Sequence, residues 1–236
     1  MITLPLALNG LPATQRLHLG CGVTRLHGWT NADLHPTAAT DLTFDCQQPW
    51  PLPPDSLAVV LASHMLEHLP RPLAFFQHAW EALEDGGLLF LRLPYGGHRS
   101  AMGDLDHQRP WYPGSFACVQ PGYAEAVRHP GYASWQWPFA VECVDLFLVP
   151  RAVRLLRWRL VRWLLLPYVS LIGEAVQELA VRLRALKSEA SLAQWRTWGH
   201  PANAVPQQYV CYAHQWYGTP PDGPGRALVV VGPVEM

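Results

Sequence analysis

Residues 17–33 read LHLGCGVTRLHGWTNAD and decide the fold. The apolar start, 17–19, predicts a short buried strand that ends at a turn with Gly20 and Gly22, where missing side chains let a ligand approach the backbone. A second short strand precedes Asp33, and an acid in that position can accept hydrogen bonds from both hydroxyls of a ribose. The stretch therefore predicts a nucleotide site at the carboxyl ends of two parallel strands.

The spacing within this stretch separates two classes of nucleotide cofactor. A dinucleotide needs a third glycine in GxGxxG, so that the amino end of a helix can reach the pyrophosphate, and Arg25 occupies that position. Asp33 follows Gly22 by 11 residues, against roughly 20 in a dinucleotide fold, which leaves little room for a helix. A phosphate-free nucleoside such as S-adenosylmethionine fits these features better.

Length, composition and charge bound the class of protein. A chain of 236 residues can form one α/β domain with an insertion. Hydrophobic residues make up 50% and charged residues 15%, the latter well below the usual ~25%, which predicts a globular protein with large apolar surfaces. A net charge of −1 argues against a dedicated nucleic-acid binder.

The cysteines and apolar runs predict a cytoplasmic protein. The five cysteines form no CxxC pair and follow no secretory signal, which predicts reduced thiols. The most apolar run, residues 163–173, is about half of what a bilayer requires. The cysteines are Cys21, Cys46, Cys118, Cys143 and Cys211.

The first 94 residues alternate between predicted strands and connections, which favours a parallel sheet covered on both faces. A helix is predicted from about Arg71 to Glu84, where Gly86 and Gly87 stop it. The uninterrupted apolar run at 57–62 predicts the central strand. The predicted strands are Leu17–Leu19, Trp29–Ala32, Asp41–Phe44, Leu57–Ala62 and Leu88–Leu93.

The rest of the chain departs from this alternation. Residues 95–138 are rich in Gly, Pro and aromatic residues and predict loops that shape a substrate site. Residues 150–198 predict two or three helices, the second carrying Glu174, Glu178 and Arg182 at i, i+4 spacing. Tyr209–Tyr217 and Ala227–Val231 predict a terminal hairpin that adds antiparallel to the sheet. The chain is thus expected to be one domain, with a cofactor-binding half (1–94), substrate-side loops (95–150), a helical insertion (151–200) and a C-terminal hairpin (205–236).

A family resemblance rests on six features in order: LHLGCG, GWTNAD, Asp45 before a proline-rich loop, LASHMLEHL, EDGG and LRLP. The series resembles the class I S-adenosylmethionine-dependent methyltransferases, in particular the compact, type 11-like branch with GCG followed closely by GWxNxD. The resemblance covers roughly Arg16–Pro94. The chain departs from the family pattern in two places: the usual third glycine is absent, and Asp85 stands where the family often has a proline before its two glycines. It implies a Rossmann-like, doubly wound, mostly parallel seven-stranded sheet with an antiparallel last strand, plus a helical insertion before the C-terminal hairpin.

The resemblance also implies how the cofactor is held. The turn Gly20-Cys21-Gly22 lies against the methionine portion of S-adenosylmethionine, Asp33 holds the ribose, and Asp45 accepts from the adenine amino group. Leu34 and Cys46 pack on the adenine faces, and Ser63 and His64 close the pocket at the fourth strand. No metal is implied.

Methyl transfer requires mainly that a nucleophile be held in line with an electrophilic methyl group. Oxygen and neutral nitrogen nucleophiles also benefit from a general base. His107, with Asp106 beside it, is the first candidate for this base, and His64 is the second. A loop-capping role for His107 is the structural alternative.

Two other functions remain open from the sequence. His64, Glu67 and His68 match HxxEH, in which two histidines one helical turn apart bind zinc and the glutamate activates water; a zinc-dependent hydrolase would use them. A non-catalytic nucleoside-binding relative would keep the cofactor residues without turnover.

The segment 151–166 is predicted to be amphipathic, and a membrane contact through 151–168 is one of the three roles that are open for it. Val153, Leu156, Leu160, Trp163 and Leu164 share one side, and Arg151, Arg154 and Arg162 the other. Such a helix can lie on a membrane, form a lid or form a dimer contact. The expected acceptor is a small molecule or a glycan- or lipid-linked molecule, in preference to nucleic acid, and the sequence leaves the oligomeric state open.

Overall fold

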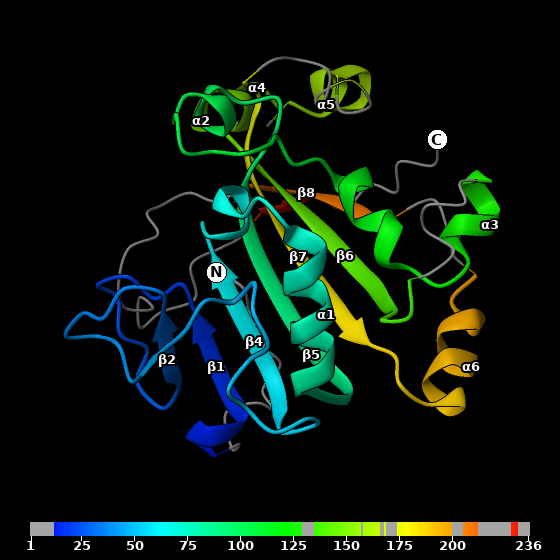
Figure 1. Cartoon of the computed structure of the whole chain (residues 1–236). Helices are drawn as coiled ribbons and strands as arrows, with labels where there is room; N and C mark the ends of the chain where they lie inside the picture. Colours follow the sequence, from blue (N-terminus) through cyan, green and yellow to red (C-terminus); the bar gives the residue numbers. More distant parts are fainter. Residues whose placement is uncertain are drawn as a thin grey trace.

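In the computed structural model, the described part of the chain forms one sheet of nine strands (Figure 1). The residues that the structure describes are 12–128, 135–156, 158–165, 168, 174–199, 205–211 and 228–230. The strands are β1 Arg16–Leu19, β2 Thr30–Asp33, β3 Leu42–Thr43, β4 Leu57–Ser63, β5 Leu83–Pro94, β6 Phe139–Leu148, β7 Val176–Ala185, β8 Gln207–Cys211 and β9 Leu228–Val230. Their order in the sheet is β3-β2-β1-β4-β5-β7-β6-β8-β9.

The first seven strands confirm the expected Rossmann-like sheet. Strands β1 to β5 pair in parallel, and β7 runs antiparallel to its neighbours β5 and β6. The expected mostly parallel sheet with an antiparallel strand late in the sequence is therefore confirmed, and β8 and β9 extend it at one edge.

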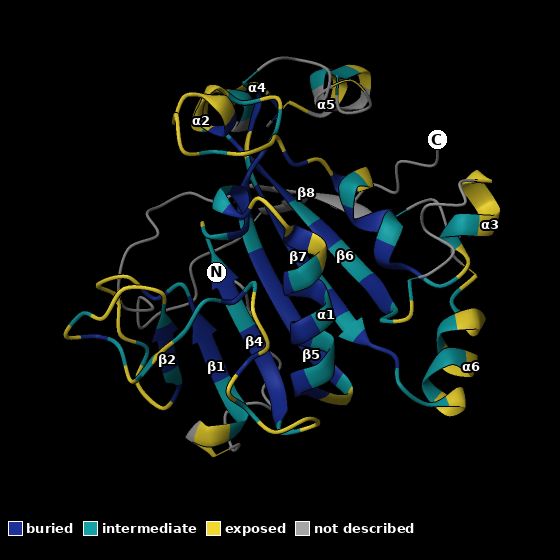
Figure 2. Ribbon diagram, in the orientation of Figure 1, coloured by how far each residue is buried: buried dark blue, intermediate teal, exposed yellow. Residues whose placement is uncertain are grey.

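The strands of the first 94 residues lie where the apolar pattern predicted them, although β5 begins already at Leu83. Residues 20–29 and 34–41, which connect β1 to β2 and β2 to β3, contain turns and no helix. For the first of these connections, the short spacing between Gly22 and Asp33 predicted the absence of a helix. As Figure 2 shows, β1, β4 and β5 form the buried centre of the sheet.

Helix α1, Pro72–Ala82, packs on one face of the sheet (Figure 1). Its start follows from Pro72, whose fixed φ suits the first position of a helix and whose missing N–H costs nothing there. The helix buries Phe75, Phe76 and Ala79 against the sheet. Phe76 contacts Phe139 of β6, with ring centroids 6.0 Å apart, so α1 joins the two halves of the chain in one core.

Both faces of the sheet carry apolar clusters because alternate side chains of a strand point in opposite directions. Val60 and Leu89 belong to the large cluster that includes α1, whereas Val59 and Phe90 belong to a smaller cluster with Trp29. The continuous apolar run at 57–62 thus reflects a strand that is buried on both faces.

The structure corrects the predicted helix with Glu174, Glu178 and Arg182. Val176–Ala185 forms strand β7, because its apolar residues alternate with polar ones and pack against β5 and β6. Phe139–Leu148, which falls within the predicted substrate-side loops (95–150), forms strand β6. The i, i+4 spacing of the charges was misleading, since in a strand residues two and four apart also share a face.

The predicted terminal hairpin is present, but its attachment differs from the prediction. β8 and β9 pair antiparallel, whereas β8 adds to β6 in parallel. Residues 212–227, which include the rest of the predicted strand to Tyr217, lie outside the described residues.

The predicted amphipathic helix over 151–166 is wrong as one element. The structure has two short helices, α4 Pro150–Leu156 and α5 Arg159–Leu165. Leu156 is buried, whereas Leu160 and Leu164 are exposed; the side chains of Val153, Arg162 and Trp163 lie outside the description. The other helical elements are the 3-10 helices η2 Ala13–Gln15, η3 Leu66–His68 and η4 Pro113–Val119, and the α-helices α2 Arg99–Met102, α3 Tyr123–Val127 and α6 Glu189–Thr197. Within the described residues, every helix is too short or too polar to cross a membrane.

The strand assignment of β7 predicts unequal effects for two adjacent substitutions. Leu183→Ala should lower the free energy of unfolding by about 2–5 kcal/mol, because Leu183 is fully buried. Arg182→Ala should cost about 1 kcal/mol or less, since Arg182 is more than one-third exposed in its ion pair with Glu142. Urea unfolding followed by circular dichroism measures both, and equal losses would contradict the assignment.

Candidate functional site

The carboxyl ends of three neighbouring strands meet at one edge of the sheet. Leu19 of β1 pairs with Ala62 of β4, and Ser63 of β4 pairs with Arg92 of β5. The backbone N–H of His64 then donates to the carbonyl of Arg92 at 2.8 Å. This register places the turn after β1 beside the turn after β4, at the edge where the sequence predicted the cofactor site.

The two glycines of the first turn are required for different reasons. Gly20 has φ +69°, and a Cβ there would lie 2.7 Å from Cγ of Met65, so Gly20 lets the two turns pack together. Gly22 has φ +53°, and a Cβ there would meet no atom within 4 Å. The space beside Gly22 is therefore open to a ligand that lies against the backbone.

Asp33, at the end of β2, fixes this turn. Its Oδ2 accepts from the backbone N–H of Gly22 at 2.8 Å, and its Oδ1 accepts from that of His35 at 2.9 Å. Each carboxylate oxygen has a further lone pair, and the residue is only half-buried. The carboxylate is thus held in place and can still accept hydrogen bonds from a ribose.

Asp45 lies near Asp33, and both carboxylates act on the thiol of Cys46. Burial, with the two negative charges, raises the pKa of Cys46 to about 12, so the thiol is neutral. Its Sγ lies 3.7 Å from Sδ of Met65, the residue that packs against Gly20. The two carboxylates and a neutral thiol therefore lie close together at this edge of the sheet. The binding of an adenine and a ribose would require such a combination.

The remaining predicted cofactor residues occupy different positions. Leu34 is 55% exposed next to Asp33, so its side chain is accessible to a ligand. Cys21 is buried, and its Sγ lies 3.7 Å from Oγ1 of Thr40, so this thiol faces the interior of the loop and the backbone of Cys21 borders the turn. Ser63 is half-buried as the last residue of β4.

His64 combines an uncommon backbone with two acidic neighbours. Its φ is +52°, a left-handed conformation that costs a non-glycine residue about 1–2 kcal/mol. Nδ1 lies 3.3 Å from Oε1 of Glu67, and Nε2 lies 3.4 Å from Oε1 of Glu178. Burial lowers the pKa of His64, but the two carboxylates outweigh it and raise the pKa to about 9. His64 is therefore charged at neutral pH and does not act as a base in this form.

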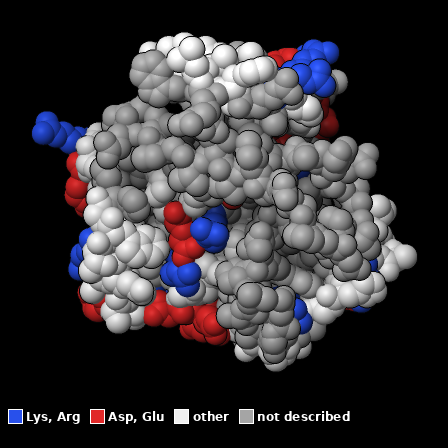
Figure 3. All heavy atoms as spheres, turned by 180° about the vertical axis from the view of Figure 1, so that it is seen from behind, with Lys and Arg blue, Asp and Glu red and all other residues white. Residues whose placement is uncertain are grey.

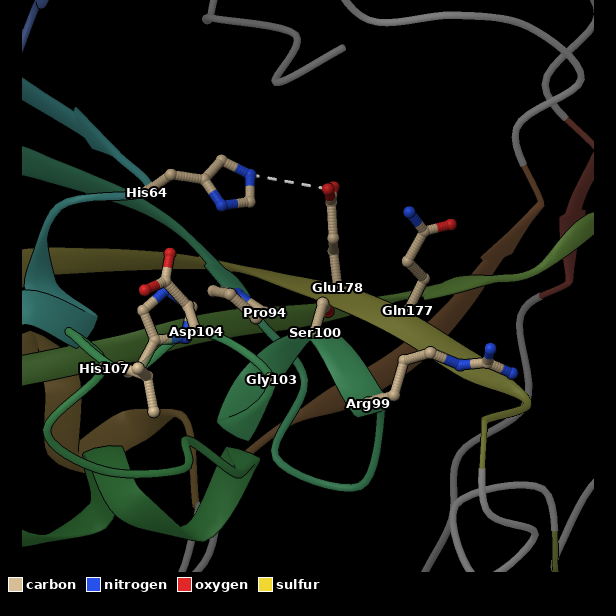
Figure 4. Close-up of a pocket in the computed structure, with 10 residues that line it drawn as sticks. His64, Pro94, Arg99, Ser100, Gly103, Asp104, His107, Gln177 and Glu178 are labelled. Atoms are coloured by element: carbon tan, nitrogen blue, oxygen red, sulfur yellow. Dashed lines mark ion pairs between the residues drawn. The ribbon is translucent and has the colours of Figure 1, made fainter.

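A cavity of about 680 Å³ opens beside His64. In Figure 4 the imidazole of His64 points toward the carboxylate of Glu178 at this cavity. The volume is in the range of small-molecule sites. The lining residues come from the ends of β4 and β5, the loop with α2, and the start of β7: His64, Pro94, Arg99, Ser100, Gly103, Asp104, Leu105, His107, Gln177 and Glu178.

Glu178 was predicted on a helix, but it lies on strand β7 and lines the cavity. Burial raises its pKa, but the contacts with His64 and Arg92 outweigh this and lower it. Arg92 donates from Nε to Oε2 of Glu178 at 2.6 Å. The alternation of apolar and polar residues in LAVRLRA, residues 179–185, was the available signal for a strand that brings Glu178 to this edge.

His107 and Asp106 are adjacent in sequence but have different partners. Nδ1 of His107 lies 2.8 Å from the carbonyl of Ala101, and because a carbonyl only accepts, Nδ1 carries the proton and Nε2 keeps a lone pair. Oδ2 of Asp106 lies 3.0 Å from Nδ1 of His68. The expected orientation of His107 by Asp106 is therefore replaced by a contact between Asp106 and His68.

Residues 64–68, which match HxxEH, do not form the α-helix that the zinc motif requires. His64 follows the last residue of β4, and Glu67 and His68 lie on the three-residue 3-10 helix η3. The motif of zinc hydrolases needs its two histidines one turn apart on an α-helix. The helix-borne form of the motif is thus absent from residues 64–68.

Comparison with known proteins identifies one family and several similar folds. The profile of a family described as "Methyltransferase domain" matches residues 18–147, more than half of the chain. An S-adenosylmethionine-dependent methyltransferase from Mesorhizobium loti is 18% identical, with 75% of this chain and 95% of that chain covered and a TM-score of 0.42. One from Archaeoglobus fulgidus is 13% identical, with 75% and 89% covered and a TM-score of 0.47. No curated protein sequence matches this chain.

Because the space at Gly22 is open, a substitution there should affect ligand affinity as well as the stability of the fold. Gly22→Ala should lower the free energy of unfolding by about 1–2 kcal/mol, because alanine is strained at positive φ. It should also weaken S-adenosylmethionine binding at least tenfold, because the new methyl group enters the open space. Thermal unfolding and titration calorimetry measure the two effects.

Gly199 supplies the matched control for this experiment. It has φ +69° and equally open space, but it follows α6, away from the turn. Gly199→Ala should show the same loss of stability with unchanged affinity. If both variants bound S-adenosylmethionine like the wild type, the ligand would not lie against Gly22.

Proposed function

Since this chain belongs to the family of methyltransferase domains, we propose that it transfers a methyl group from S-adenosylmethionine to a small-molecule or glycan- or lipid-linked acceptor. The observation that carries the cofactor assignment is the open turn at Gly22 with the half-buried carboxylate of Asp33 bound to its backbone. When bound, S-adenosylmethionine supplies a methyl group that is electrophilic because it is attached to a positively charged sulfur.

The residues at the strand ends have separable tasks in this proposal. Asp33 accepts from the ribose hydroxyls and Asp45 from the adenine amino group. Leu34, which is exposed, offers an apolar surface to the adenine, and Cys46, which is buried, borders it with a neutral thiol. These contacts hold the cofactor at the edge where β4 ends, and His64 lies between this site and the cavity.

The cavity is the proposed acceptor site. Its lining carries both signs of charge, with Asp104 and Glu178 opposed by His64 and Arg99. A polar acceptor of small-molecule or sugar size fits this charged lining better than a purely apolar acceptor does. His107 lines the cavity, and its Nε2 carries a lone pair that can accept a proton or bind a cation.

Nucleic acid is a poor fit as the acceptor. The net charge of the chain is −1, and nucleic-acid binding requires a clustered basic surface. On the face seen from behind, acidic and basic side chains lie side by side among residues that the structure does not describe (Figure 3). The arginines that do cluster in the sequence, between residues 151 and 162, are interspersed with apolar residues, which suits a bilayer better than a phosphate backbone.

A lipid-linked acceptor is favoured by the surface of α4 and α5. Five arginines and no acid occur between residues 146 and 173. Leu160 of α5 is 69% exposed, and Trp158 between the helices is 60% exposed; the other exposed apolar residues of this surface are Leu155, Leu164 and Tyr168. Apolar and aromatic side chains on the same segment as the exposed Arg151 and Arg154 suit the interface of an anionic bilayer. We therefore propose that this surface docks on anionic membranes from the cytoplasm.

Cofactor binding is tested by titration calorimetry with S-adenosylmethionine and S-adenosylhomocysteine. The wild type should bind with micromolar Kd, about −8 kcal/mol. Asp33→Ala should raise Kd about 100-fold, because hydrogen bonds to a charged group contribute about 1.5–3 kcal/mol. Glu84→Ala serves as control, since Glu84 is exposed at the opposite end of β5. Unchanged affinity of Asp33→Ala would refute the ribose assignment, and no binding by the wild type would refute the function.

Membrane docking is tested by sedimentation with vesicles of phosphatidylglycerol and phosphatidylcholine. The wild type should bind the anionic vesicles and dissociate as salt is raised, because arginine attraction to anionic lipid is screened. Replacing Leu160 and Leu164 together with Glu should reduce binding at least tenfold. Leu73→Glu, at an exposed apolar position of α1, should leave it unchanged. A wild type that stays in solution, or that forms dimers through this surface in light scattering, contradicts docking.

A further inference from the structure

Three side chains beside the cavity form a cluster with metal-ligand chemistry. Glu67 and His68 lie on η3, and His107 lies in the loop after α2. One ligand atom from each of the three lies within 4.8 Å of the others, and the two imidazole rings have centroids 4.8 Å apart. Residues about 40 positions apart in the sequence are thus brought to one point.

The carboxylate of Glu67 is buried without hydrogen bonds. Glu67 is 1% exposed, and neither of its oxygens has a hydrogen-bond partner among the described residues. The imidazole of His64 lies 3.3 Å from one oxygen, but it is shared with Glu178 on its other side. A buried carboxylate whose oxygens accept no hydrogen bond needs further partners, and a bound cation provides one.

Both histidines are held as metal-binding histidines are. In known metal sites, one ring nitrogen donates to a carboxylate or carbonyl and thereby orients the other toward the metal. Nδ1 of His68 contacts Oδ2 of Asp106 at 3.0 Å, and Nδ1 of His107 contacts the carbonyl of Ala101 at 2.8 Å. In both residues Nε2 is the nitrogen left for a further ligand.

We propose that Glu67, His68 and His107 bind one divalent first-row transition-metal ion and that its open coordination positions receive an oxygen of the methyl acceptor. Two imidazoles and one carboxylate form a donor set suited to Zn²⁺, Mn²⁺ or Fe²⁺ more than to Mg²⁺. Bond lengths of about 2.0–2.2 Å require the ligand atoms to draw together by about 1–2 Å on binding, which side-chain rotation allows for the half-buried histidines.

The site differs from the HxxEH motif in the roles of its residues. Glu67 is a ligand here and not the base that activates water, and His107 takes the place of His64. Three protein ligands leave coordination positions free. Because His107 also lines the cavity, an acceptor bound there can reach the ion.

The second part of the proposal rests on the proposed methyl transfer and names an oxygen acceptor. A hydroxyl group that binds a divalent ion becomes more acidic, as a bound water does. Its proton passes to solvent, its oxygen forms the bond to the methyl carbon, and the electron pair of the broken carbon–sulfur bond stays on sulfur. In this arrangement His107 binds the ion and no histidine is needed as base.

Metal binding is measured on protein stripped with EDTA and dialysed. Titration calorimetry with Zn²⁺ and Mn²⁺, and metal analysis of the loaded protein, should show one ion per chain. His107→Ala and Glu67→Gln should each weaken binding at least tenfold, and Asp106→Asn about 10- to 100-fold, as loss of a partner that orients a ligand does. Thermal unfolding should show that His107→Ala, at a half-buried position, is folded.

His78→Ala is the matched control. His78 of α1 also lies beside a carboxylate, with Nδ1 3.1 Å from Oε2 of Glu81, but it is not part of the cluster. Its substitution should leave the affinity unchanged. Less than one ion per wild-type chain, equal affinity in the wild type and His107→Ala, or preference for Mg²⁺ would each overturn the site.

Catechol, a bidentate oxygen ligand, tests the open positions. It should bind the Zn²⁺-loaded wild type and neither the stripped protein nor His107→Ala; failure to bind the loaded protein overturns the acceptor part. Calorimetry with S-adenosylmethionine separates this proposal from the proposed function. Metal binding without S-adenosylmethionine binding overturns the function and keeps the ion site, and the reverse result overturns the ion site alone.

Discussion

The pairing of β4 with β1 on one side and β5 on the other determines where every proposed functional group lies. β4 is buried on both faces, and its register pairs Leu19 of β1 with Ala62 and Arg92 of β5 with Ser63. The same register ends the three strands together. Gly20 and His64 therefore lie at one edge, and the backbone bond from His64 to Arg92 fixes the turn after β4.

The charges at this edge depend on one another. Arg92 and His64 both contact Glu178, and His64 also contacts Glu67. These groups come from the turn after β4, η3, β5 and β7, so the set of charges is complete only when these segments pack together. The left-handed backbone of His64 is tolerated because packing and ion pairs hold it from several directions. Uncommon backbone and partly buried charge are typical of functional sites.

The sequence predicted the first 94 residues well because their structure is determined locally. Apolar runs, glycines and prolines mark each strand end there, and the cofactor residues directly follow strands. Glu178 was misplaced because charges in β7 are spaced for a helix as well as for a strand, and packing against β5 and β6 decides between them. The contact of Asp106 with His68 also escaped prediction, since adjacency in sequence pointed Asp106 to His107. Such contacts depend on how a long loop returns to the sheet.

The surface of α4 and α5 is connected to the cavity by the backbone itself. α4 begins two residues after β6 ends, and the N–H of Val149 donates to the carbonyl of Ala175 at 3.0 Å. The next residues, Gln177 and Glu178, line the cavity. The segment that would lie on a membrane thus starts and ends at the same edge of the sheet as the acceptor site. Under the proposed function, an acceptor held in a bilayer by its lipid would reach this cavity without leaving the membrane, and the exposed apolar surface and the polar cavity would then serve one kind of substrate.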